Sequence, residues 1–98
     1  MRMPRTRYLV SYDIADPRRL RRVARIVEGF GVRLQYSVFE CALDDTRLAR
    51  LKAALHPELN HEEDQVLFVS LGPSSGDASL VIESMGRAYL VRTRVTII

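Results

Sequence analysis

An aspartate that directly follows an apolar, strand-forming segment is the residue in this sequence with the clearest chemical potential. Asp13 comes after residues 8–12, YLVSY, a nearly uncharged run of the kind found in strands buried on both faces of a sheet. A carboxylate is the hard oxygen ligand that Mg²⁺ prefers, and the ion is often held by one or two carboxylates together with water and substrate phosphate. A single aspartate binds it poorly, so a metal site here requires a second copy of Asp13 across a two-fold axis.

The same position also has a structural interpretation. Asp13 or Asp16 could accept hydrogen bonds from the free N–H groups that open the next helix, where the helix dipole favours a negative charge. A cap of this kind needs neither a metal nor a partner chain. The sequence leaves both interpretations open.

Arginine is concentrated beside Asp13. Fourteen of the fifteen basic residues are arginines, and residues 1–33 have a net charge of +6, whereas residues 34–83 have a net charge of −6. The planar guanidinium matches phosphate oxygens, so the basic end is the predicted contact with a polyanion. A general bias towards arginine, as in heat-adapted proteins, is the alternative explanation of the count. The candidate nucleic-acid-binding residues are Arg18, Arg19, Arg21, Arg22, Arg25 and Arg33.

Several other kinds of site are excluded or disfavoured by the residues present. The single cysteine, Cys41, cannot form an internal disulfide and fits no zinc-binding spacing. His56 and His61 lie within the acidic residues 56–64, which we interpret as a flexible loop because nothing there enforces the geometry of a transition-metal site. No nucleophile elbow, P-loop or dinucleotide fingerprint occurs, which excludes serine-hydrolase, NTPase and Rossmann chemistry.

The elements that position these residues begin with a central strand at residues 8–12. Asp16 and Pro17 form a strong helix start, and apolar residues then recur at helical spacing until Gly29 and Gly31 close the helix. Residues 32–43 have strand character with a slip in phase between Val38 and Phe39, which indicates either two short strands or one kinked strand.

The second half of the chain repeats the pattern of helix and strand. The pair at residues 44–45 opens a second helix that Pro57 ends, and residues 65–71 form the next strand. Residues 72–77 are rich in turn formers, residues 80–82 are a candidate short strand, and residues 89–98 alternate as a terminal strand.

This order predicts an α+β fold of the ferredoxin-like β-α-β-β-α-β kind, with an additional C-terminal strand and both helices on one face of an antiparallel sheet. The 98 residues form a single domain, 1–98. The apolar terminal strand has no partner left in a four-stranded sheet, so we expect a second protomer to cover that edge. The chain contains neither a signal-peptide pattern nor a membrane span, and we expect it in the cytoplasm.

Two motifs at their spacing resemble the CRISPR-associated protein 2 family. They are residues 8–16, YLVSYDIAD, and residues 33–40, RLQYSVFE, separated by the arginine-rich helix and Gly31. The similarity extends through Asp64 and the strand at residues 66–71 to Gly86. The resemblance implies a ferredoxin-like protomer in a symmetric homodimer, whose C-terminal strand, here about 89–98, extends the sheet of the partner.

The resemblance also implies an activity and its residues. Members of the family are described as Mg²⁺-dependent endonucleases acting on single-stranded RNA or double-stranded DNA, with Asp13 at the position of the metal ligand. Arg22 matches the second of two helix arginines, while Leu20 occupies the position of the first. The positions that match residues tied to activity are Asp13, Tyr12, Arg22, Arg33, Ser37 and Phe39.

The family further bridges two dimers of CRISPR-associated protein 1, the integrase, in a complex that inserts foreign DNA as a new spacer for antiviral defence. Phosphate contacts in that role confer affinity and salt dependence without base specificity. The rival hypothesis to a nuclease is therefore a non-catalytic DNA-binding adaptor in which Asp13 is a buried cap. A third hypothesis, a small-molecule regulator of the same fold, predicts little affinity for polyanions.

Overall fold

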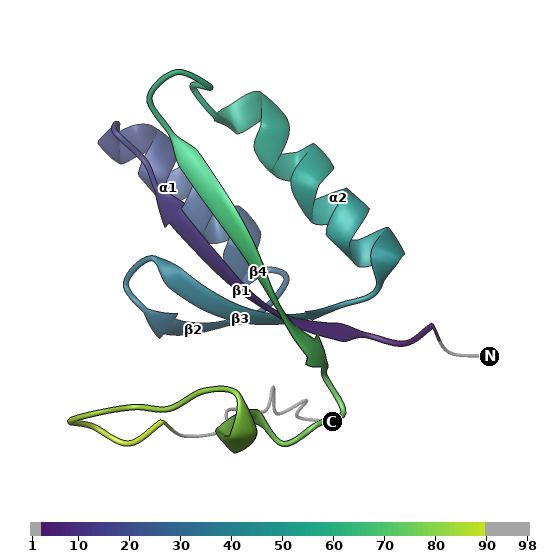
Figure 1. The fold of residues 1–98 in the computed structure, drawn as a ribbon. Coiled ribbons are helices and arrows are strands. Elements are labelled where there is room, and N and C mark those ends of the chain that lie inside the picture. Colours follow the sequence, from purple (N-terminus) through teal and green to yellow (C-terminus); the bar gives the residue numbers. More distant parts are fainter. Residues whose placement is uncertain (1–2, 90–98) are drawn as a thin grey trace, which may run out of the picture.

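The computed structural model describes residues 3–89 as a four-stranded antiparallel sheet with two helices on one face (Figure 1). The strand order is β2-β3-β1-β4, which is the ferredoxin-like arrangement that the sequence predicts. Along the chain the elements are β1 (Thr6–Asp13), α1 (Pro17–Glu28), β2 (Val32–Gln35), β3 (Val38–Leu43), α2 (Asp45–Leu55), the 3-10 helix η1 (His56–Glu58), β4 (Gln65–Pro73) and the 3-10 helix η2 (Ala78–Leu80).

Strand β1 lies in the interior of the sheet, as predicted, between β3 and β4. Successive side chains of a strand point to opposite faces. Val10 and Tyr12 are therefore buried under the helices, while Ser11 and Asp13 belong to the opposite face. This alternation decides that Tyr12 and Asp13, although adjacent in sequence, have different surroundings.

Both helices begin at side-chain caps. The Asp16 carboxylate accepts hydrogen bonds from the backbone N–H groups of Arg18 and Arg19, each at 2.9 Å, and Pro17 occupies the first turn. These bonds, chiefly that from Arg19, lower the pKa of Asp16. At α2, Asp44 accepts from the N–H of Arg47 at 2.8 Å. The cap of α1 is therefore Asp16 and not Asp13.

The phase slip in residues 32–43 corresponds to two strands. A two-residue turn, Tyr36 and Ser37, joins β2 to β3, and the pairing of β2 with β3 shifts register between Arg33 and Gln35. The expected short strand at residues 80–82 is wrong, because η2 begins just before it.

Helix η2 starts at an aspartate whose local hydrogen bonds favour a turn. Asp77 accepts from the Ser79 N–H at 2.9 Å and from the Ser79 hydroxyl at 2.7 Å, which curls the chain instead of extending it. The predicted terminal strand, residues 89–98, lies outside the described residues apart from Tyr89. No helix within residues 3–89 is both long enough and apolar enough to cross a membrane.

The segment after β4 returns across the sheet face opposite the helices (Figure 1). Arg7 of β1 donates to the carbonyl oxygens of Ser74 and Gly76 at 3.0 and 2.9 Å, and its Nε lies 3.7 Å from a Glu40 carboxylate oxygen. The hydroxyl of Tyr89 donates to the other Glu40 oxygen. Burial, with this hydrogen bond, raises the pKa of Tyr89 to about 12. A polar cluster therefore fixes this segment against the sheet.

The helices cover a single apolar core. Its buried side chains come from β1, β3 and both helices. Gly31 lets the chain after α1 pass close to β3. A methyl group added at Gly31 would lie 2.3 Å from the Glu40 carbonyl oxygen and 2.4 Å from the Cys41 sulfur. The fully or nearly fully buried core residues are Val10, Tyr12, Val23, Val27, Phe39, Cys41, Leu43, Leu51 and Leu55.

We expect Gly31→Ala to lower the free energy of unfolding by about 1 to 3 kcal/mol, because the added methyl group must displace backbone as well as a side chain. Gly29→Ala is the matched control. Its added Cβ would lie 3.3 Å from one carbonyl oxygen, and its φ of −70° suits alanine, so a change below about 1 kcal/mol is expected. Urea denaturation measures both, and equal effects would contradict the close approach at Gly31.

Candidate active site

Asp13 is the last residue of β1 and lies at the end of the sheet where the start of β4 and the turn between β2 and β3 also lie. Its pairing partner is Gln65, the first residue of β4, and the neighbouring Tyr12 N–H donates to the Ser37 carbonyl oxygen at 3.1 Å. The Asp13 side chain is exposed and makes no hydrogen bond or ion pair with any residue between 3 and 89. The hypothesis of a buried cap at Asp13 is therefore wrong, because Asp16 accepts the helix N–H groups instead.

The donor set at Asp13 fits Mg²⁺ in a limited way. An exposed carboxylate that no cation of the described chain neutralises is a suitable hard ligand, and Mg²⁺ usually keeps several waters. Among residues 3–89, however, no three His, Cys, Asp or Glu side chains come together as a metal site. One protomer therefore supplies one ligand at Asp13, and a shared site needs the second copy.

Two of the residues implied by the resemblance, Tyr12 and Phe39, belong to the core. Tyr12 is 4% exposed and Phe39 is fully buried, and their rings stack with centroids 6.1 Å apart. The Tyr12 hydroxyl donates to the Tyr36 carbonyl oxygen at 3.4 Å. A fully buried ring does not contact a nucleic acid, so in this structure Phe39 acts on a site only through the residues packed against it.

The turn between β2 and β3 lies at the same end of the sheet as Asp13. Ser37 is half-buried, and its carbonyl oxygen is occupied by the N–H of Tyr12. The guanidinium carbon of Arg33, an exposed residue, lies 5.1 Å from the centroid of the Phe39 ring. Arg33 thus contacts Phe39, and Phe39 contacts Tyr12, the residue directly before Asp13.

The arginines of α1 divide into two groups. Three of them, Arg18, Arg21 and Arg25, are exposed and make no side-chain hydrogen bond or ion pair within the part of the chain that the structure describes. Arg22 donates to Glu58 at 2.9 Å but retains 53% of its side-chain exposure. Arg18 lies three and four positions before Arg21 and Arg22, and these two lie four and three positions before Arg25, so the four residues share one side of the helix. We call them the arginine stripe.

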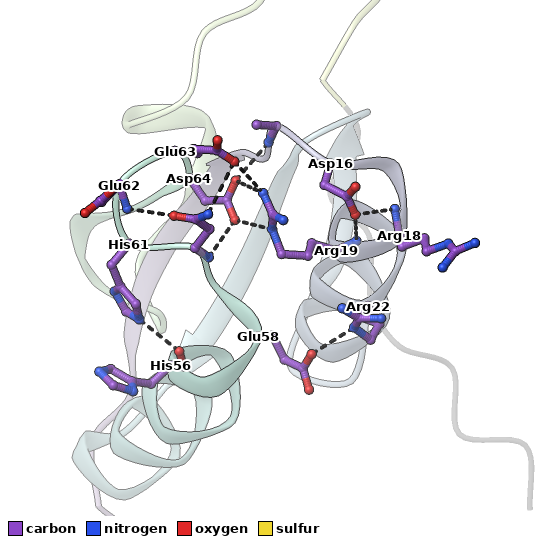
Figure 2. Close-up of polar contacts among 12 residues, drawn as sticks. Asp16, Arg18, Arg19, Arg22, His56, Glu58, His61, Glu62, Glu63 and Asp64 are labelled. Carbon is purple, nitrogen blue, oxygen red and sulfur yellow. Dashed lines mark hydrogen bonds and ion pairs between the residues drawn. The ribbon is translucent and has the colours of Figure 1, made fainter.

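Arg19 differs from the arginine stripe. Its Nε lies 2.8 Å from one Asp64 oxygen and its Nη2 lies 3.2 Å from the other, and the same Nη2 contacts Glu63 at 3.1 Å (Figure 2). Only 21% of the side chain is exposed. Two carboxylates contact the Nε and Nη2 atoms of Arg19, so this residue is less available to a phosphate than the arginine stripe, and phosphate binding by Arg19 stays a prediction.

Asp64 is the residue that the sequence analysis missed as a structural contact of the site. Its side chain has no exposed area, and hydrogen bonds from Arg19, together with the N–H groups of Ala15 and Asn60, hold the pKa of this carboxyl well below its usual range. The sequence signal is weak, since Asp64 follows Glu62 and Glu63 and looks like one more surface acid.

The acidic loop, residues 56–64, carries its own hydrogen bonds rather than lying free. His61 Nε2 contacts the His56 carbonyl oxygen at 3.0 Å, and the two imidazole rings lie 4.6 Å apart (Figure 2). Asn60 accepts from the Glu62 N–H at 3.0 Å. These bonds and those to Asp64 give residues 56–64 a defined arrangement in the structure, and the flexibility expected from the sequence stays a prediction.

Residues 6–77 match the family model described as "CRISPR associated protein Cas2". This chain belongs to the Cas2 family. A relative from Geobacter sulfurreducens, named "CRISPR-associated endoribonuclease Cas2", is 43% identical over 82 residues, which is 84% of this chain and 85% of the relative. A Thermus thermophilus relative of the same name is 44% identical over 83 residues, covering 85% of this chain and 79% of that one.

Solved structures agree with the assignment to the Cas2 family. The crystal structure of Streptococcus pyogenes Cas2 at pH 6.5 has a TM-score of 0.71 with 30% identity, and the match covers 82% of this chain and 99% of that one. A hypothetical protein, TT1823, from Thermus thermophilus has a TM-score of 0.74 with 31% identity over 88% of this chain and 96% of that one. The fold is therefore shared with these structures.

The lowered pKa of Asp64 predicts a specific pH dependence of stability. Because the folded-state pKa lies below the ordinary value of 3.8, ionised Asp64 stabilises the fold above that value, and this contribution is lost as the pH falls from about 5 towards the folded-state pKa. We expect Asp64→Asn to be destabilising at pH 7 and progressively less so below pH 5. Urea denaturation at pH 7 and pH 3 tests this, and an equal loss at both pH values would contradict it.

Proposed function

We propose that this protein is a homodimeric, Mg²⁺-dependent endonuclease of CRISPR adaptation that cleaves phosphodiester bonds of single-stranded RNA or double-stranded DNA. The observation that carries the proposal is an exposed Asp13 carboxylate without a partner among the described residues, next to a helix with exposed arginines. Relatives are named endoribonucleases, which supports nuclease chemistry and makes RNA the first substrate to test.

Each group in this site has a distinct part in the proposed reaction. The Asp13 carboxylates of two protomers would hold Mg²⁺, which when bound supplies an activated water and stabilises charge on the scissile phosphate. The arginine stripe and Arg33 bind neighbouring phosphates and orient the strand. The packing of Tyr12 against Phe39 fixes the end of β1, and no side chain in the described residues is placed as an obvious general base.

A symmetric dimer is supported by apolar surface on the sheet face away from the helices. Leu67 and Val69 of β4 are 48% and 45% exposed, and Leu80 and Met85 of the returning segment are 82% and 101% exposed. Within residues 3–89, β4 is also an edge strand, and such a strand presents unpaired backbone groups to a second chain. A second copy of this protein would bury this surface and bring the second Asp13 into reach.

A non-catalytic adaptor that bridges two dimers of the integrase CRISPR-associated protein 1 is the second candidate. The observation that favours it is that the exposed members of the arginine stripe suit a duplex backbone whether or not bond cleavage follows. The two functions share the binding surface and differ in their need for Asp13.

We expect Asp13→Asn to lower cleavage of labelled single-stranded RNA by about a hundredfold or more, because the variant loses a metal ligand worth several kcal/mol in the transition state. Asp45→Asn, an exposed aspartate on α2, is the matched control and should cleave normally. Wild-type protein with chelator should resemble Asp13→Asn. Metal-dependent cleavage that survives in Asp13→Asn would contradict the assignment, and inert proteins that bind duplex DNA equally well would favour the adaptor.

Removing one phosphate contact should change the salt dependence of binding. For Arg21→Gln we expect the slope of log affinity against log salt to fall in magnitude by about 0.7 on single strands or about 0.9 on duplex, with no change in sequence preference. Arg50→Gln, an exposed arginine on α2, is the control with an unchanged slope. Fluorescence anisotropy from 50 to 200 mM salt measures both. Equal slopes for wild type and Arg21→Gln would remove Arg21 from the binding surface.

A further inference from the structure

One buried carboxylate joins three segments around the candidate site. Asp64 Oδ1 accepts from the Ala15 N–H at 2.9 Å, and Oδ2 accepts from the Asn60 N–H at 2.9 Å. Arg19 donates to both oxygens, and Figure 2 shows its guanidinium turned towards Asp64. The Asp64 side chain has no exposed area, so these contacts are not shared with solvent.

The bond to Ala15 bears directly on Asp13. Ala15 lies two residues after Asp13 in the short link between β1 and α1, and Gln65, the residue after Asp64, is the pairing partner of Asp13. Asp13 is therefore held on one side by strand pairing and on the other by the hydrogen bond to the link. A carboxylate at a strand end without the second contact would be free to vary its position.

The pair with Arg19 extends this positioning to helix α1. Its two contacts, at 2.8 and 3.2 Å, have the bidentate geometry of a strong, directional ion pair. Since Arg19 lies in the first turn of α1, the pair also sets where Arg18 and Arg21 lie relative to Asp13.

Resting on the proposed function, we infer that Asp64 is a positioning residue for phosphodiester cleavage. With Arg19 it fixes the link between β1 and α1 so that the Asp13 carboxylate lies at the scissile phosphate while the arginine stripe binds neighbouring phosphates of the same strand. The alternative is a purely stabilising contact, which would change the population of folded protein but not the activity of each folded molecule.

Asp64→Asn separates these two possibilities with a minimal change of shape. Each carboxylate oxygen accepts two hydrogen bonds, from Ala15 and Arg19 at Oδ1 and from Asn60 and Arg19 at Oδ2. An amide has only one acceptor oxygen, so its NH₂ group must oppose two N–H donors whichever way it is turned. The variant therefore loosens the link without removing Asp13 or any member of the arginine stripe.

We expect Asp64→Asn to lower kcat per folded molecule by about ten- to a hundredfold, with KM changed less than about threefold, because a small displacement of a catalytic group is costly while phosphate binding is retained. The Ala15 amide should exchange with deuterium faster, while the amide of Val10 in the middle of β1 keeps its protection. Folded fractions come from urea denaturation under the assay conditions.

Two further variants make the test specific. Glu63→Gln alters the exposed carboxylate that shares Arg19 but has no contact with Ala15, so it should keep the wild-type kcat. Arg19→Lys keeps the charge but loses the bidentate contact with Asp64, so we expect a loss of kcat smaller than that of Asp64→Asn. If Asp64→Asn does not fold, the outcome for Arg19→Lys decides the inference.

The inference is overturned if Asp64→Asn keeps the wild-type kcat per folded molecule although Ala15 exchanges faster, or if the lost activity merely tracks the folded fraction. If wild type cleaves no nucleic acid with any divalent metal, the proposed function fails and the positioning role is judged by Mn²⁺ affinity, followed through paramagnetic broadening of resonances near Asp13. Weaker Mn²⁺ binding in Asp64→Asn would then support positioning, and equal or absent binding would overturn it.

Discussion

The contact between Asp64 and Arg19 is the interaction on which the arrangement of the site depends. A buried carboxylate loses its hydration, and it is stable only when hydrogen bonds and an opposite charge replace the water. Here the replacement comes from three separate segments, the link after β1, the first turn of α1 and the loop before β4. The same bonds that make Asp64 tolerable in the interior therefore hold these segments in register around Asp13.

This arrangement divides the basic residues by role. Arg7 and Arg19 make contacts within the molecule, Arg7 with the returning segment and Arg19 with Asp64, and each has little exposed surface. Arg18, Arg21 and Arg25 are turned to solvent. Net charge alone does not reveal this division. For the helix arginines, the division follows from which side of α1 faces the acidic loop.

The sequence predicts most of the fold and part of the site. The strand at residues 8–12, the cap at Asp16 and the helical spacing of α1 are local patterns, and local patterns are visible in sequence. For residues 32–43 the sequence leaves two alternatives, two short strands or one kinked strand, since register and turn depend on pairing between strands. The short strand expected at residues 80–82 failed because Asp77 forms local turn contacts that compete with extension. Asp64 was missed because its partners are distant in the chain, so no periodicity marks it.

The proposed function requires two copies of Asp13 to share one metal ion at a two-fold axis, and the stoichiometry of metal binding tests this requirement. Titration with Mn²⁺, followed by electron paramagnetic resonance on protein of known mass, counts ions per chain. If two copies of Asp13 share the ion, we expect one tightly bound ion for every two chains of wild type and none in Asp13→Asn. One ion per chain, or tight binding that survives in Asp13→Asn, would contradict it.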